Sequence, residues 1–96
     1  MTKLEIVNSI SDKIGVERVD VQTVLEAFMH EVKSSLSNGE DVFLRGFGSF
    51  IVKQRAQKTG RDISKNTTII IPAHNVPAFK PSKEFVNKVK TNVQIG

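Results

Sequence analysis

The chain has 96 residues, no cysteine and a formal net charge of +4 at pH 7. This length fits one small domain, and a lone chain of this size buries only about 60–65% of its unfolded surface, so its stability as a monomer is marginal. The lack of cysteine excludes disulfides and thiol chemistry. No apolar run approaches the roughly 20 residues of a membrane span, and the first ten residues lack the features of a secretory signal, so we expect a cytoplasmic protein.

The positive charge is confined to one part of the chain. Residues 1–41 carry four basic and eight acidic residues, whereas residues 42–96 carry ten basic residues and two acids. Such an asymmetry is typical of a polyanion-binding half joined to a half with another role. A solvated basic surface with no partner is the alternative that charge alone leaves open.

Residues 1–40 predict two amphipathic helices. Thr2 and Glu5 fit a capping box at the start of the first helix, and Gly15 is suited to end it in a left-handed conformation. The second helix is expected to start at residues 17–20 and to stop at residues 38–39, with Phe28 in its apolar stripe. Each helix has one broad apolar face, so the pair needs a third layer to cover it.

The rest of the chain predicts a sheet and a final helix. Residues 41–44 and 47–52 read as strands, and Gly46 and Gly48 indicate a bend or a close backbone approach between them. Residues 69–71 open a return strand that residues 76–79 close, with Pro72 at an edge or a bulge. Ser82 follows Pro81 at the start of the last helix, and residues 91–96 are expected to fray.

Residues 54–68, QRAQKTGRDISKNTT, separate the two apolar runs of the sheet. They contain four basic residues and one acid, and their only apolar side chains are Ala56 and Ile63. Such a segment cannot bury enough apolar area to offset its ordering entropy, yet strong strand formers flank it. The sequence therefore predicts a basic arm of two strands that extends past the core, with one isolated apolar side chain near its tip.

Catalytic, metal and cofactor sites are not expected. His30 and His74 lie on different elements without a cluster of carboxylates, and the run from Gly46 to Gly48 lacks the spacing of a phosphate-binding loop. Six phenylalanines without Trp or Tyr fit a dry interior better than a base-stacking surface. We therefore expect a protein that is not an enzyme.

The order of these motifs resembles the bacterial HU and integration host factor family. The motifs are RGFGSF at 45–50, R-x-x-K-T-G-R at 55–61 and VPAFKPSKEF at 76–85, and the resemblance covers about residues 1–90. The spellings at 45–50 and 79–85 are slightly more similar to integration host factor than to HU. The resemblance implies an α+β fold: a two-helix hairpin, a three-stranded antiparallel sheet with a long basic β-arm, and a short C-terminal helix, in an intertwined dimer. It implies double-stranded DNA as the partner, bound in the minor groove by two arms and bent or compacted in the nucleoid.

The same resemblance assigns roles along one domain. Residues 1–40 would be the helical dimerisation part, 41–80 the sheet and arm, 81–90 the C-terminal helix and 91–96 a tail. The expected DNA-binding residues are Lys3, Arg45, Lys53, Arg55, Lys58, Arg61, Ile63, Lys65, Lys80 and Lys83, and the expected dimer core is Phe28, Phe47, Phe50 and Phe79. For each single lysine, solubility alone is an open alternative, whereas the planar fork of arginine favours phosphate contact in the arm.

The arm tip departs from the pattern of the family. The usual R-N-P is replaced by Arg61, Asp62 and Ile63. Asp62 adds a negative charge beside DNA phosphate, while Ile63 stays apolar but loses the fixed φ of proline. We favour Ile63 as an intercalating wedge, since isoleucine is among the side chains that enter base steps. The alternatives are that Ile63 packs on the arm's own strands or that the arm kinks DNA only weakly.

Two other classes of function stay open at this point. The basic arm would also serve an RNA or single-strand binder, or a module that docks an acidic protein, although the arm has almost no apolar side chains to act as hot spots for a protein partner. The sequence leaves undecided whether binding is sequence-specific, whether the partner subunit is identical or a paralogue, and how far the DNA bends.

Overall fold

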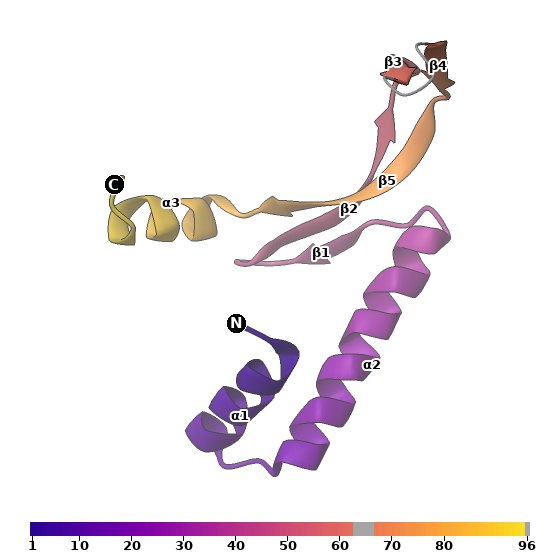
Figure 1. The fold of residues 1–96 in the computed structure, drawn as a ribbon. Helices are drawn as coiled ribbons and strands as arrows, with labels where there is room; N and C mark the ends of the chain where they lie inside the picture. Colours follow the sequence, from indigo (N-terminus) through magenta and orange to yellow (C-terminus); the bar gives the residue numbers. More distant parts are fainter. Residues whose placement is uncertain (63–66, 96) are drawn as a thin grey trace. The chain divides into compact units, whose positions relative to one another are not determined.

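The computed structural model describes residues 1–62 and 67–95, which form three helices and five strands. In chain order the elements are α1 (Lys3–Ile14), α2 (Arg18–Ser37), β1 (Val42–Leu44), β2 (Gly48–Arg55), β3 (Lys58–Asp62), β4 (Thr67–Ile71), β5 (His74–Pro81) and α3 (Lys83–Asn92) (Figure 1). The chain divides into two compact units, Met1–Ser35 and Leu36–Gly96. The first contains α1 and most of α2, and the second contains the strands and α3.

The first unit confirms the predicted helical hairpin. The hydroxyl oxygen of Thr2 accepts a hydrogen bond from the Glu5 backbone N–H at 3.3 Å, which satisfies one of the free donors of the first turn of α1. Gly15 ends α1 with φ +73°, and its N–H donates to the Ser11 carbonyl. Val7 and Val21 are the buried hydrophobic residues of the described chain. One chain therefore has a very small interior of its own.

The second unit is built on an antiparallel sheet in the order β1-β2-β5. A turn with Gly46 at φ +81° joins β1 to β2. At Gly48 a Cβ atom would lie 2.6 Å from the backbone carbonyl oxygen of Lys80, so only glycine fits there. This confirms the close backbone approach that the glycines predicted. β2 is longer than predicted, because its pairing with β5 continues to Arg55 opposite His74.

Side chains of this sheet alternate between an apolar face and a second face, which we call the basic face. On the apolar face Phe50 pairs with Phe79, their ring centroids 4.9 Å apart. Phe47 lies 5.2 Å from Phe79 and 5.4 Å from Phe85 of α3, so four rings form one cluster. The apolar cluster fixes which residues of β2 and β5 are directed to the other face.

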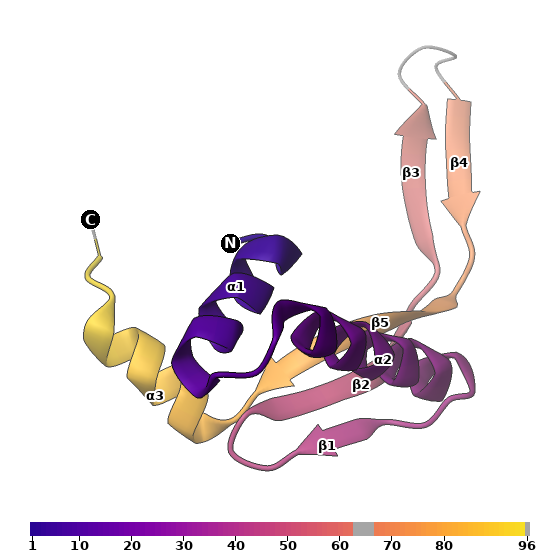
Figure 2. The same cartoon turned by 90° about the horizontal axis from the view of Figure 1, so that it is seen from below.

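The predicted arm is present as a second antiparallel pair, β3 and β4, which extends beyond the three-stranded sheet (Figure 2). Pairing runs from Lys58 opposite Ile71 to Asp62 opposite Thr67, so the return strand starts two residues earlier than predicted. Residues 56–57 and 72–73 lie outside the strands. Each strand is interrupted for two residues, so the pairing of β3 with β4 continues the register in which β2 pairs with β5. Pro72, which has no N–H to donate, lies in this interruption.

The last helix begins as predicted but ends later. Ser82 caps α3 by accepting a hydrogen bond from the Phe85 N–H at 3.2 Å, and its hydroxyl donates to the Gly46 carbonyl at 3.0 Å. The expectation that residues 91–96 are frayed was wrong at its start, since α3 continues to Asn92 and the Val93 N–H donates to the Val89 carbonyl. Helix propensity gave no signal for a stop at residue 90, and backbone hydrogen bonds extend α3 two residues beyond that point.

Candidate nucleic-acid interface

The basic face of the sheet collects cations from two strands. Lys53 and Arg55 come from β2, and Lys80 comes from β5, where it pairs with Ser49. Directly opposite residues share a face, and so do residues two apart along a strand. The three cations therefore lie on the face opposite the phenylalanine cluster. Side chains along a strand alternate between the two faces. Because Phe50 and Phe79 are directed to the apolar face, these cations are directed to the opposite face.

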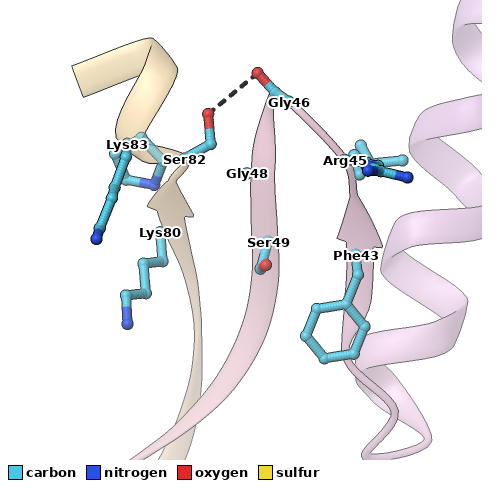
Figure 3. Close-up of a pocket in the computed structure, with 10 residues that line it drawn as sticks. Phe43, Arg45, Gly46, Gly48, Ser49, Lys80, Ser82 and Lys83 are labelled. Carbon is cyan, nitrogen blue, oxygen red and sulfur yellow. Dashed lines mark hydrogen bonds between the residues drawn. The ribbon is translucent and has the colours of Figure 1, made fainter. Parts of the chain in front are cut away.

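An open hollow of about 450 Å³ lies at the end of this face nearest α3 (Figure 3). It is lined by Phe43, Leu44, Arg45, Gly46, Gly48, Ser49, Lys80, Pro81, Ser82 and Lys83. The hydrogen bond from the Ser82 hydroxyl to the Gly46 carbonyl links the start of α3 to the β1–β2 turn. That link brings Lys83, the first residue of α3, to the same hollow as Lys80.

Phe43 also lies on the basic face, which the sequence analysis missed. It pairs with Ser49 across β1 and β2, and the residue is 73% exposed. The expectation that the phenylalanines form a dry interior is therefore wrong at this position. The alternation of β1 contained the signal, because Val42 and Leu44 are directed to the apolar face and the residue between them must be directed away.

The cations of this face have no acidic salt-bridge partner among the side chains that the structure describes, those of residues 1–61 and 67–95. No acid there forms a salt bridge with Arg45, Lys53, Arg55, Lys80 or Lys83. Lys3 differs, because its Nζ lies 2.8 Å from Glu26 Oε1 in the first unit. The hydrogen bond from Lys3, with a second from Gln22, lowers the pKa of Glu26. Any phosphate contact by Lys3 therefore competes with this carboxylate.

The arm divides its cations between two faces. Arg61 pairs with Thr68, and Thr59 with Ile70, on one arm face. Lys58 pairs with Ile71 and lies on the other arm face. The sequence motif grouped Lys58 with Arg61, but their spacing of three residues along a strand separates them. Ile63 and Lys65 lie outside the described residues.

The residues expected in a dimer core occur in both units. Phe47, Phe50 and Phe79 belong to the ring cluster, together with Phe85 of α3. Phe28 lies on α2 in the first unit and is 39% exposed.

The described part of the chain contains no group of three or more His, Asp or Glu side chains that could hold a metal ion. None of its helices is long and apolar enough to cross a membrane.

Comparison with known families decides the assignment. The family of bacterial DNA-binding proteins matches residues 1–90. The chain belongs to this family. It is 38% identical over 90 residues to the DNA-binding protein HU of Thermus thermophilus, covering 94% of this chain and 93% of that protein. It is 37% identical over 90 residues to the integration host factor subunit alpha of Proteus mirabilis, covering 94% and 92%. These near-equal identities do not separate the two branches of the family.

Solved structures of the family share the fold. The Anabaena HU–DNA cocrystal structure matches with a TM-score of 0.89 and 37% identity, over 93% of this chain and 97% of that one. The α+β arrangement predicted for the family is thereby confirmed.

Proposed function

We propose that the chain is an architectural DNA-binding protein that acts as a dimer, binds the minor groove of double-stranded DNA with its two β-arms, and bends or compacts the duplex. The observation that carries the proposal is the basic face, which Lys53, Arg55 and Lys80 share and where no acid with a described side chain forms a salt bridge with them. Phosphate contacts supply most of the affinity of such proteins, so uncompensated cations on one face favour a polyanion. The related HU solved in complex with DNA supports DNA as that polyanion.

The proposal gives the candidate residues separate roles. Lys53, Lys80 and Lys83 would neutralise phosphates on the body of the protein, and Arg45 and Lys3 would do so at the flank, Lys3 by exchanging its carboxylate partner for a phosphate. Arg55 at the end of β2, with Lys58, Arg61 and Lys65 of the arm, would follow the groove, and Ile63 would be the intercalating wedge. Phosphate contacts position the protein without reading sequence.

Dimerisation follows from what one chain leaves uncovered. Phe47 is 45% exposed and Val89 48% exposed, although both lie on apolar faces. Phe79, Phe85, Val86 and Val89 line an open apolar hollow of about 460 Å³ together with Pro81 and Lys90. Because the chain has so few buried residues, a second copy that covers these surfaces is needed for stability, with Phe28, Phe47, Phe50 and Phe79 in the shared core. A closely similar paralogue would serve equally well.

The proposal also extends to organisation and location. Residues 1–40 would be the dimerisation part, 41–80 the sheet and arm, and 81–90 the C-terminal helix of one DNA-binding domain. The protein would act in the cytoplasm on the nucleoid, and it would have no catalytic role.

The salt dependence of binding tests the proposal. The logarithm of the affinity for a short duplex should fall linearly with the logarithm of salt concentration, by about 0.9 per phosphate neutralised. Replacing Lys53 and Lys80 together with glutamine removes four charges from a dimer, so the slope should flatten by up to about 3.6 if each lysine meets one phosphate.

A matched variant distinguishes binding through the basic face from binding that depends on net charge alone. Lys13→Gln with Lys88→Gln removes as many charges outside the basic face and should leave the slope nearly unchanged. Equal losses in the two double variants would show that net charge alone drives binding. Affinity for single-stranded nucleic acid equal to that for the duplex would favour the single-strand or RNA binder instead.

A further inference from the structure

We propose that the hollow beside Phe43 is a separate site for an unpaired nucleotide, whose base stacks on the Phe43 ring while Lys80 and Lys83 hold its phosphate. The inference rests on the proposed DNA-binding function and adds a ligand class to one end of the same face. It gives a role to a side chain that phosphate binding does not require.

Phe43 stands apart from the other phenylalanines of its unit. Phe47, Phe50, Phe79 and Phe85 pack on one another, with ring centroids 4.9–6.2 Å apart. Phe43 has no aromatic neighbour among the described residues and is directed to the opposite face of the sheet. Phe43 as a whole residue is 73% exposed, so it contributes little to the interior and its apolar surface is available to a ligand.

The surroundings of the ring match the two ends of a nucleotide. Phe43, Ser49 and Lys80 form one row across β1, β2 and β5, so the Cα atoms of Phe43 and Lys80 lie about two strand spacings apart, or ~10 Å. In Figure 3 the Phe43 ring lies at one side of the row, while Lys80 and Lys83 lie at the other. The hollow thus offers an aromatic face at one end, a hydroxyl between and two cations at the other.

The ring favours an unpaired base over an intact duplex. In a duplex both faces of each base are stacked on neighbours, so a protein ring at the surface meets sugars, phosphates and base edges but no free base face. Phenylalanine has no polar atom that could bind a phosphate. A base released from its stack has a free π-face, and stacking it on an aromatic side chain contributes about 1–3 kcal/mol.

Gapped DNA with a fluorescent adenine analogue in the single-stranded gap tests the site. The parent protein should bind this DNA, and stacking should quench the analogue. Phe43→Ala should weaken binding to the gapped DNA by about 5- to 150-fold, which is the stacking contribution converted to a ratio, and should relieve the quenching. Its affinity for the intact duplex should stay within about twofold, because the phosphate contacts remain.

Three further variants make the result specific. Phe43→Leu keeps apolar area without a ring and should behave like Phe43→Ala, whereas Phe43→Tyr should retain the quenching. Lys80→Gln should weaken binding to both DNAs. Ile63→Ala changes the arm tip and should leave the quenching in place.

Several outcomes would overturn the inference. Equal loss on gapped and intact DNA would make Phe43 a sugar or backbone contact, and an unchanged affinity would give it no role. A change in the oligomeric state of Phe43→Ala without DNA, measured by light scattering, would make the ring a contact between copies of the chain.

One outcome distinguishes the site from the proposed function. If the parent protein bound gapped DNA with quenching but did not bind the intact duplex, the proposed function would fail and the nucleotide site would stand.

Discussion

Replacing Gly48 with alanine tests how tightly β2 packs on β5. An ideal Cβ atom at this position lies 2.6 Å from the Lys80 carbonyl oxygen and 2.7 Å from Cζ of Phe79. The oxygen belongs to the paired backbone of β5, so it cannot move without disturbing the ladder. The φ of +159° adds strain for any L-residue. Overpacking costs about 1–3 kcal/mol and backbone strain about 1–3 kcal/mol, so the variant should lose about 2–6 kcal/mol.

Thermal unfolding at a fixed protein concentration measures this loss. A domain of this size loses about 4–8 °C in Tm per kcal/mol, so Gly48→Ala should melt at least about 8 °C below the parent protein. Gly46→Ala is the matched control, two residues earlier. It also has a positive φ, +81°, but its Cβ would meet only Glu84 Oε2 at an ordinary 3.7 Å. It should therefore incur the strain without the clash.

The comparison of the two variants decides the question. If Gly48→Ala melts within the error of Gly46→Ala, the carbonyl of Lys80 yields at little cost and the argument from close approach is wrong. If both variants melt with the parent, neither the clash nor the positive φ limits stability.

Three other perturbations have defined outcomes. Glu26→Gln should lower the Tm only at higher pH: the pKa of Glu26 is lowered by Lys3 in the folded state, so the stabilisation is present above the ordinary value of 4.5 and is lost as pH falls through the folded value. A Tm difference that persists unchanged in acid would contradict this reading. Phe47→Ala should abolish the folded dimer in light scattering and circular dichroism, because it removes a shared core contact worth about 3–5 kcal/mol, and a folded parent monomer at low micromolar concentration would count against it. Ile63→Ala should preserve the fold and the salt slope but reduce DNA bending measured by end-to-end energy transfer. Unchanged bending would mean that Ile63 is not the wedge.

Local signals account for most of the fold that could be predicted. The hydroxyls of Thr2 and Ser82 cap their own helices, and Gly15 ends α1, all through contacts within a few residues. The arm could be predicted because its sequence combines strand formers at both ends with too little apolar area to join a core. These features depend on short stretches of chain, so one sequence contains enough information to place them.

Features that depend on pairing were harder to predict. Whether Lys58 and Arg61 share an arm face depends on their position opposite β4, and the shared motif concealed that they do not. Phe43 was counted as interior because composition does not record direction, and β1 is only three residues long. The extent of β2 depends on the partner residues in β5 rather than on its own composition. The wedge role of Ile63 stays a prediction.

The paired interruption between the sheet and the arm has a mechanical consequence. Residues 56–57 and 72–73 lie opposite one another and outside the strands, so this level of the arm lacks a continuous ladder to stiffen it. Because bending concentrates where a ladder is interrupted, we predict that this level acts as a hinge. Because neither strand gains a residue there, flexing changes the angle of the arm without exchanging its inner and outer side chains. If the arms bind DNA as proposed, such a hinge lets one arm follow grooves of different width while presenting the same residues to each.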